Sequence, residues 1–93
     1  MEVKWTSSAH RDLARLYEFL AAEDPRAAKK AVTQIIKQAK LLRSHPLLGV
    51  ELDAYAPRDV RRLIIGDYEV RYEVTATTLY VLRLWHTRED RLP

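Results

Sequence analysis

Two strand-like segments joined by two turn residues constrain this chain more than any other feature. Val60–Ile65 and Tyr68–Val74 flank Gly66-Asp67, a pair typical of a tight two-residue β-hairpin turn. Because so short a loop leaves little freedom of register, Arg62 should lie directly opposite Arg71. The sequence therefore predicts an antiparallel strand pair of defined register.

The second strand of this pair alternates apolar and charged residues. The set predicted to face the core is Tyr68, Val70, Tyr72 and Val74, and the set predicted to face outward is Glu69, Arg71 and Glu73. Arginines facing each other across strands are destabilising unless neighbouring glutamates compensate. Two interpretations stay open at this point: a solvated charged face, or a face that receives an anionic partner.

The N-terminal half reads as a strand and two helices. Val3–Thr6 alternates as a short strand, and Ser7 or Ser8 is expected to cap the helix that follows. Its apolar stripe is Ala9, Leu13, Leu16, Tyr17 and Leu20. Asp24-Pro25 should begin a second helix, which buries Ala28, Val32, Ile35, Ala39 and Leu42 and ends by Ser44-His45. So short a break between the helices predicts an antiparallel helical hairpin.

The closing strand, Leu79 to His86, has apolar side chains at both alternating sets of positions. Such a strand lies centrally in a sheet or has its second face covered by another molecule. The order of strand, two helices and a three-stranded antiparallel meander predicts an α+β fold within one domain, residues 1–93. Because two helices cover only one sheet face, we expect a protein partner on the other.

Composition narrows the function classes. The chain has no cysteine, which excludes disulfides and thiolate metal sites, and its three histidines share no ligand spacing. No apolar stretch approaches the roughly 18 residues of a membrane span, and the N-terminus does not resemble a secretory signal, so a cytoplasmic location without cofactors is expected. The net charge of +3 is concentrated between Pro25 and Val50, which hold six basic residues and no acidic one. That patch suits an acidic partner or is a solvated helix face.

Three motifs together resemble a known family. They are Pro46 followed by Gly49, the stretch VRRLIIGDYEVRYEV (60–74) and the stretch LYVLRLWHTRED (79–90). In order and spacing, over nearly the whole chain, they resemble the ParE branch of the RelE/ParE superfamily of bacterial toxins. The resemblance implies the toxin of a type II toxin–antitoxin pair. ParE-like members bind DNA gyrase and block replication, whereas RelE-like members cut mRNA in the ribosome. In both, a small antitoxin binds across the toxin and neutralises it.

Individual residues favour the ParE-like branch. RelE-like nucleases carry a phosphate-binding arginine where this chain has Glu69, which would repel phosphate. Arg62 matches one basic position of the nucleases, Val60 falls at another, and His86 fits their strand-end histidine or tyrosine. The alternative therefore remains a ribosome-dependent endoribonuclease that uses His86, Arg62 and Arg71. A third interpretation is a family member that has lost toxicity and only binds its antitoxin.

The resemblance also suggests binding residues. We expect the antitoxin on the outer sheet face, in contact with Arg62, Arg71, Tyr80, Leu82 and Leu84. The C-terminal segment contributes to toxicity in ParE-like proteins, so Trp85, His86, Arg88 and Arg91 are the expected target contacts. His86 is interpreted as a strand-end residue, half packed and half solvated, rather than a catalytic group. No metal is expected, nucleic acid is expected to be contacted only through a complex, and the functional form should be a hetero-oligomer with the antitoxin.

Overall fold

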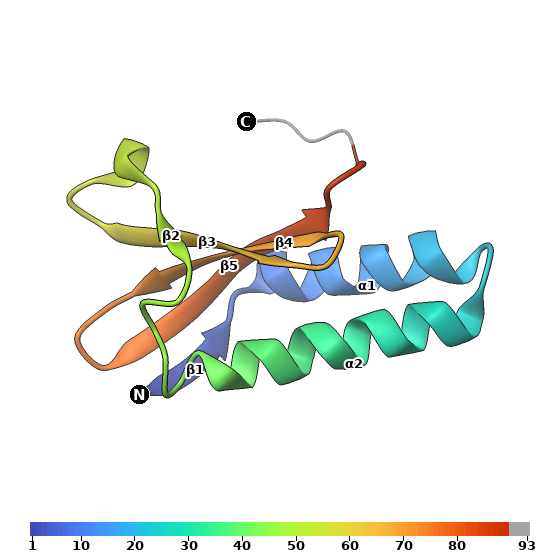
Figure 1. The fold of residues 1–93 in the computed structure, drawn as a ribbon, viewed down its shortest axis with the longest axis horizontal. Helices are drawn as coiled ribbons and strands as arrows, with labels where there is room; N and C mark the ends of the chain where they lie inside the picture. The colour runs from blue at the N-terminus through green and yellow to red at the C-terminus, as the bar shows by residue number, and fades with distance from the viewer. Residues whose placement is uncertain (90–93) are drawn as a thin grey trace.

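The computed structural model describes residues 1–89, which fold as a sheet covered on one face by a helical hairpin (Figure 1). The elements in chain order are β1 (Glu2–Trp5), α1 (Ser7–Ala21), α2 (Pro25–Leu41), β2 (Val50–Glu51), the short 3₁₀ helix η1 (Asp53–Tyr55), β3 (Asp59–Ile65), β4 (Tyr68–Val74) and β5 (Thr78–His86). The five strands lie in the order β1-β5-β4-β3-β2. β1 runs parallel to β5, and the other neighbours are antiparallel. The predicted α+β fold and its meander are confirmed, and the short strand β2 is an addition.

The central hairpin has the predicted register. Arg62 is paired with Arg71, and the turn residue Gly66 has a φ of 59°, in the left-handed region that glycine tolerates best. The inner set of β4 includes the fully buried Val70 and Tyr72. The two-residue turn therefore determines which side chains of β3 and β4 enter the core.

The helix starts differ in how well they were predicted. Thr6, rather than Ser7 or Ser8, caps α1: its hydroxyl accepts the Ala9 N–H at 3.1 Å and donates to the Leu82 carbonyl at 2.9 Å. The prediction failed because the capping residue was chosen by type alone, while β1 ends one residue earlier and leaves Thr6 beside β5. Asp24 caps α2 by accepting from the N–H groups of Arg26 and Ala27, as predicted.

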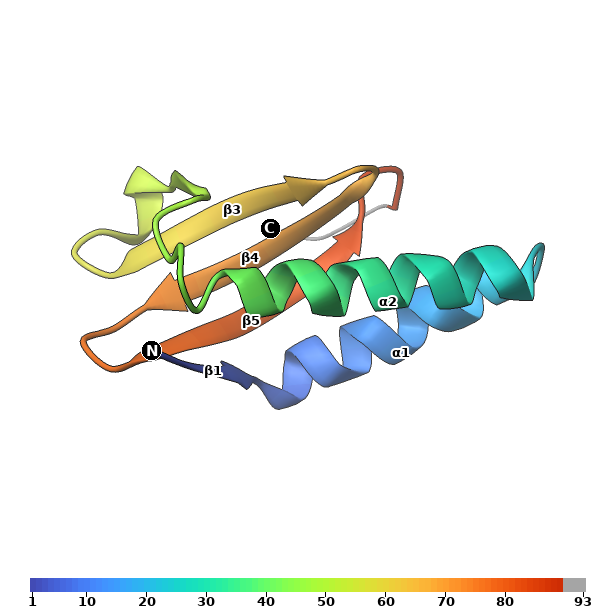
Figure 2. The same cartoon turned by 60° about the horizontal axis from the view of Figure 1, so that its bottom comes forward.

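The helical hairpin packs through small residues. The buried residues of α2 include Ala28, Ala31, Ile35 and Ala39; Val32, predicted to be buried, is half exposed and Ala31 takes its place. Figure 2 shows α1 and α2 lying side by side over β5 and β4. The core between these layers is formed mainly by Leu16, Ile35, Leu42, Tyr72, Leu79, Val81 and Leu84.

Tyr72 joins the connector to the core. Its buried hydroxyl donates to the Pro46 carbonyl at 2.8 Å and accepts the Gly49 N–H at 2.8 Å. Burial raises the pKa of Tyr72, and the Gly49 N–H acts in the opposite direction. A Cβ at position 49 would lie 2.8 Å from both the Arg62 carbonyl oxygen and this hydroxyl, so only glycine fits. The Pro-x-x-Gly motif is thus a structural requirement of the connector.

Candidate protein-binding surfaces

Three arginines form one row across the outer sheet face, because Arg62 is paired with Arg71 and Arg71 with Arg83. Arg71 donates to Glu69 at 2.9 Å and to the Tyr55 hydroxyl at 3.1 Å, and its guanidinium lies 4.9 Å from the centre of the Trp85 ring. Each of these contacts stabilises the cation. Arg71 is therefore held in place within the sheet face.

Of the two glutamates predicted to compensate the facing arginines Arg62 and Arg71, only one does so. Glu69 does pair with Arg71, but it is only 2% exposed, so the interpretation of this face as solvated does not hold at Glu69. Glu73 binds Arg58 instead, with oxygen–nitrogen distances of 2.8 and 3.1 Å. The hydrogen bond from Arg58 lowers the pKa of Glu73, although burial opposes this. Arg62 is exposed and forms no ion pair within residues 1–89.

Arg83 leaves the row toward the helices. A register shift between Arg71 and Tyr72 gives β5 one extra residue, Leu82, and so forms a β-bulge. Beyond it Arg83 reaches the carboxylate of Asp12 on α1, at 2.7 and 3.2 Å, and this hydrogen bond raises the pKa of Arg83. Asp12 also accepts the Leu84 N–H at 3.0 Å. α1 therefore occupies the edge of β5 that β1 is too short to reach.

The bulge corrects the interpretation of the closing strand. Leu79 and Val81 enter the core before the bulge and Leu84 after it, so β5 is apolar mainly toward one face, with its phase shifted by one residue. Leu84 is fully buried, and its prediction as an exposed antitoxin contact was wrong for this reason. Tyr80 and Leu82 are half exposed and remain predictions as contacts.

His86 lies inside the protein and not at the edge of a surface. It is 2% exposed, and its ring centre lies 5.3 Å from that of Tyr68 and 6.0 Å from that of Phe19. Its Nδ1 accepts the Arg88 N–H at 3.0 Å, so this nitrogen carries no proton in this arrangement. The expectation of a half-solvated histidine was wrong, because Phe19 was not predicted to pack on it.

The turn after β5 is fastened to α1. Glu89 accepts the His86 N–H at 2.9 Å and binds Arg15 at 2.9 Å, while Arg15 also donates to the Leu84 carbonyl at 3.3 Å. Trp85, predicted to contact the target, is only 6% exposed and therefore offers little surface. Arg88 is exposed as a target contact requires, and Arg91 lies outside the described residues.

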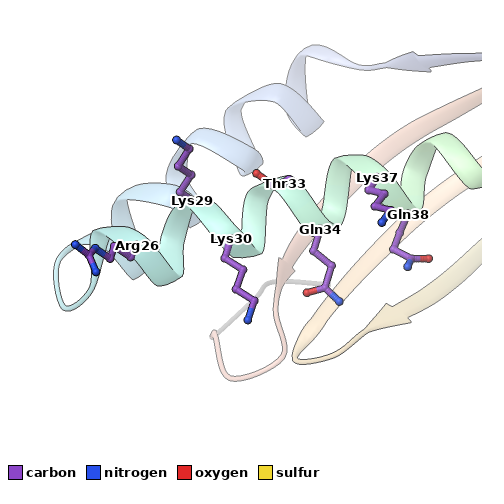
Figure 3. A pocket seen from close by; sticks show the side chains of 7 residues that line it. All are labelled: Arg26, Lys29, Lys30, Thr33, Gln34, Lys37 and Gln38. Carbon is purple, nitrogen blue, oxygen red and sulfur yellow. The ribbon is translucent and has the colours of Figure 1, made fainter.

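The basic patch is a helix face. The side chains in Figure 3 that line a shallow hollow all come from α2: Arg26, Lys29, Lys30, Thr33, Gln34, Lys37 and Gln38. Because no second element contributes a wall, this surface is open and lacks the shape of a ligand cleft. Residues 1–89 contain no cluster of three or more potential metal ligands, and no helix in that range is long and apolar enough to cross a membrane.

Several residues that organise these surfaces were missed from the sequence, namely Asp12, Arg15, Phe19, Tyr55 and Glu89. Asp12 had a usable signal, because it follows Ala9 by three residues and precedes Leu16 by four, which places a carboxylate in the buried stripe. The contacts of Tyr55 with Arg71 and of Glu89 with Arg15 span long sequence separations and carried no comparable signal.

Comparisons with known proteins identify the family to which this chain belongs. The model of the family described as the ParE toxin of the type II toxin–antitoxin system parDE matches residues 3–91. The chain belongs to the ParE toxin family. Among solved structures, it is similar to the chromosomal ParDE toxin–antitoxin system from P. aeruginosa, with a TM-score of 0.78 and 28% identity over 92% of this chain and 95% of that chain.

A second similar structure is the toxin–antitoxin complex RelBE2 from Mycobacterium tuberculosis, with a TM-score of 0.69 and 26% identity over 91% of this chain and 95% of that chain. The comparison with curated proteins gives no match. Both structural relatives come from toxin–antitoxin systems, and the family match agrees with the predicted ParE-like branch.

Proposed function

We propose that this ParE-family protein is a toxin that inhibits DNA gyrase by binding it, without catalysis, and that a cognate antitoxin keeps it inactive. The observation that carries the proposal is the state of the three groups that a nuclease would use. His86 is buried with Nδ1 already accepting a hydrogen bond, Arg71 is bound to Glu69, and Arg62 alone is exposed. One accessible cation is too few to position and cleave RNA.

The carboxylate of Glu69 weighs most against phosphate chemistry. A phosphate placed on Arg71 would also approach this carboxylate, which lies 2.9 Å from the guanidinium. At a separation of about 4 Å and an effective dielectric constant of about 20, two like unit charges repel by about 4 kcal/mol. This repulsion offsets most of the attraction between the phosphate and a single arginine, so an anionic substrate is disfavoured at this position.

An exposed arginine in the turn after β5 supports a role in protein binding. Arg88 follows the fastened turn at His86 and is exposed, within the segment that was predicted to contact the target, although its guanidinium lies 3.5 Å from Nε2 of His86. Arginines are favoured in protein interfaces because their planar guanidinium forms paired hydrogen bonds. Gyrase and the antitoxin are both protein partners, and this mode of action would place the toxin in the cytoplasm.

The decisive experiment measures DNA supercoiling by purified gyrase in the presence of the purified protein. Inhibition is expected, with Arg88→Glu reducing it and Lys37→Glu serving as a control on the helix face. In a parallel assay with ribosome-bound mRNA, no cleavage is expected. Cleavage that disappears in His86→Ala, together with unaffected gyrase, would contradict the proposal. Inactivity in both assays would favour a family member that only binds its antitoxin.

The pairing is tested separately by co-expression with the neighbouring small reading frame. The expected antitoxin has a DNA-binding N-terminal part and an acidic, amphipathic tail. Co-purification of the two proteins supports the pair, and its failure at comparable expression levels contradicts it.

A further inference from the structure

The outer face of α2 carries a run of cations that no carboxylate neutralises. Four of them line the hollow in Figure 3, and we call this group the α2 stripe: Arg26, Lys29, Lys30 and Lys37. All four are exposed, and none of them forms an ion pair within residues 1–89. The sequence has no acidic residue from Pro25 to Val50. The charge of the stripe is therefore available to a ligand.

Arginines of the sheet are held differently from the cations of the stripe. Arg58, Arg71 and Arg83 each bind a carboxylate, with nitrogen–oxygen distances of 2.8, 2.9 and 2.7 Å. These pairs fix the guanidinium groups and cancel much of their charge. The surplus of positive charge in this chain is thus concentrated on α2 and not on the sheet.

The arrangement of these cations is unfavourable for the helix itself. Arg26 precedes Lys29 by three residues and Lys30 by four, and like charges at these spacings repel each other on a helix. Arg26 also lies in the first turn, where the helix dipole disfavours a cation and where α2 has no acidic residue. A face that only keeps a protein soluble usually mixes charges of both signs. An anionic ligand would relieve this repulsion.

The side chains between the cations favour nucleic acid over a protein ligand. The other residues that line the hollow are Thr33, Gln34 and Gln38, so it contains no aromatic and no large aliphatic side chain. Protein interfaces are centred on such apolar anchors and are depleted in lysine. Phosphate groups of DNA, in contrast, are bound by lysine, arginine, threonine and glutamine. The hollow has this second composition.

The shape of the surface favours a DNA duplex among nucleic acids. Figure 3 shows Lys29 on one side of the helix and Lys30 with Gln34 on the other. The major groove of B-DNA is about 12 Å wide and admits a helix, whose flanks then meet phosphates of both strands. The major groove of duplex RNA is too narrow for this, and single strands are held by stacking on aromatic rings, which the hollow lacks.

We propose that the α2 stripe binds the phosphate backbone of double-stranded DNA without sequence preference. From Arg26 to Lys37 the stripe spans about 17 Å along the helix axis. A duplex carries one phosphate charge per about 1.7 Å of its axis, so it offers partners to all four cations in any position along its length. The inference goes beyond the proposed inhibition of gyrase, because this binding requires neither gyrase nor the antitoxin.

The proposal is tested by fluorescence anisotropy with the purified protein and a short labelled DNA duplex of arbitrary sequence. The logarithm of the association constant should fall with the logarithm of the salt concentration with a slope of about −3.6, which is about −0.9 for each of four phosphate contacts. Lys30→Gln with Lys37→Gln removes two of these contacts. This double variant should raise the dissociation constant at least about tenfold at low salt and reduce the slope by about 1.8.

A matched control carries the same loss of charge outside α2. Arg11→Gln with Arg62→Gln removes two cations at exposed positions of α1 and β3. The dissociation constant should change less than about threefold, with the salt slope unchanged. Equal losses in the two double variants would show that DNA responds to the net charge of the protein and not to the stripe. Urea denaturation confirms that each variant is folded.

The class of ligand is tested in the same assay by competition. Single-stranded DNA and duplex RNA of equal length should bind at least about threefold more weakly than the DNA duplex. Equal or tighter binding of either one would contradict the assignment to duplex DNA. If a polyglutamate peptide binds as tightly as the duplex and is released by Lys30→Gln with Lys37→Gln, the stripe is a site for an acidic protein segment and the proposal fails.

DNA binding by the stripe and inhibition of gyrase can fail separately. Inhibition is assigned to the turn after β5, so Lys37→Glu should weaken DNA binding and still inhibit supercoiling as the wild type does. A protein that inhibits gyrase but binds no duplex at low salt would contradict the stripe proposal alone. A protein that binds DNA through the stripe but leaves gyrase unaffected would contradict the proposed function alone.

Discussion

The two halves of β5 differ in how they are held. Up to Val81 the strand lies between β4 and the parallel β1, and both of its edges are hydrogen-bonded by backbone groups. Beyond the bulge at Leu82, β1 has ended, and side chains of Thr6, Asp12 and Arg15 take over the free edge.

The difference shows how helix side chains can bind the strand edge that a short parallel strand leaves unpaired. A backbone ladder tolerates most side chains, whereas an edge held by a carboxylate, a hydroxyl and a guanidinium depends on each of them. The second half of β5 also leads directly to His86, Arg88 and Glu89. The proposed target-binding end of the sheet is therefore sensitive to substitution of the side chains that hold it.

The largest expected effect separates the two leucines around the bulge. Leu84→Ala should lower the free energy of unfolding by about 3 kcal/mol, because it opens a cavity in the core. Leu82→Ala, at a half-exposed position, should cost less than about 1 kcal/mol. Urea denaturation measures both, and equal losses would mean that the bulge does not separate the two positions as described.

A smaller effect is expected when the helix-held edge is disturbed. Asp12→Ala removes the acceptor of the Leu84 N–H and should cost about 2 kcal/mol, while the half-exposed guanidinium of Arg83 regains water and adds little. Asp12→Asn, which retains an acceptor oxygen, should recover part of this loss. As a control in the backbone-held half, Glu2→Ala should leave the midpoint of urea unfolding nearly unchanged, and a loss as large as that of Asp12→Ala would remove the distinction between the halves.

The smallest effect concerns the dependence of stability on pH, and it involves β4, the strand paired with the first half of β5. Glu73, paired across strands with Tyr80, has a pKa lowered from its usual value of 4.5 by Arg58. Because the folded-state pKa lies below the unfolded one, the stabilisation is present above about pH 4.5 and is lost as the pH falls through the folded value. Wild type should thus be slightly more stable than Glu73→Gln at pH 7 and equal to it once the pH lies below the folded-state pKa of Glu73. A difference that persists at the acidic end would show that the pair does not act through ionisation of Glu73.

Much of the fold was predictable because local chemistry specifies it. The turn at Gly66-Asp67 determines the register of β3 and β4, and Asp24-Pro25 determines where α2 begins. Motif order over most of the chain also indicated the ParE family, which the match over residues 3–91 confirms.

The candidate surfaces were less predictable. The prediction that Leu84 contacts a partner assumed strict alternation of side chains along β5. The alternation changes phase at the bulge, so Leu84 faces the core instead. The burial of His86 depends on Phe19, which comes from a helix 67 positions earlier in the chain. Contacts of this kind arise from packing between elements and have no local sequence signal.

The amino-acid sequence alone determined the elements, the register of the central hairpin and the family, since turns, caps and hydrophobic periodicity act over a few residues. Only the tertiary structure decided which groups reach the surface. A single extra residue in β5 reverses the facing of the side chains beyond it, and α1 then binds the exposed edge with Asp12 and Arg15. Exposure is a property of packed layers, and for that reason it could not be predicted from the local sequence pattern.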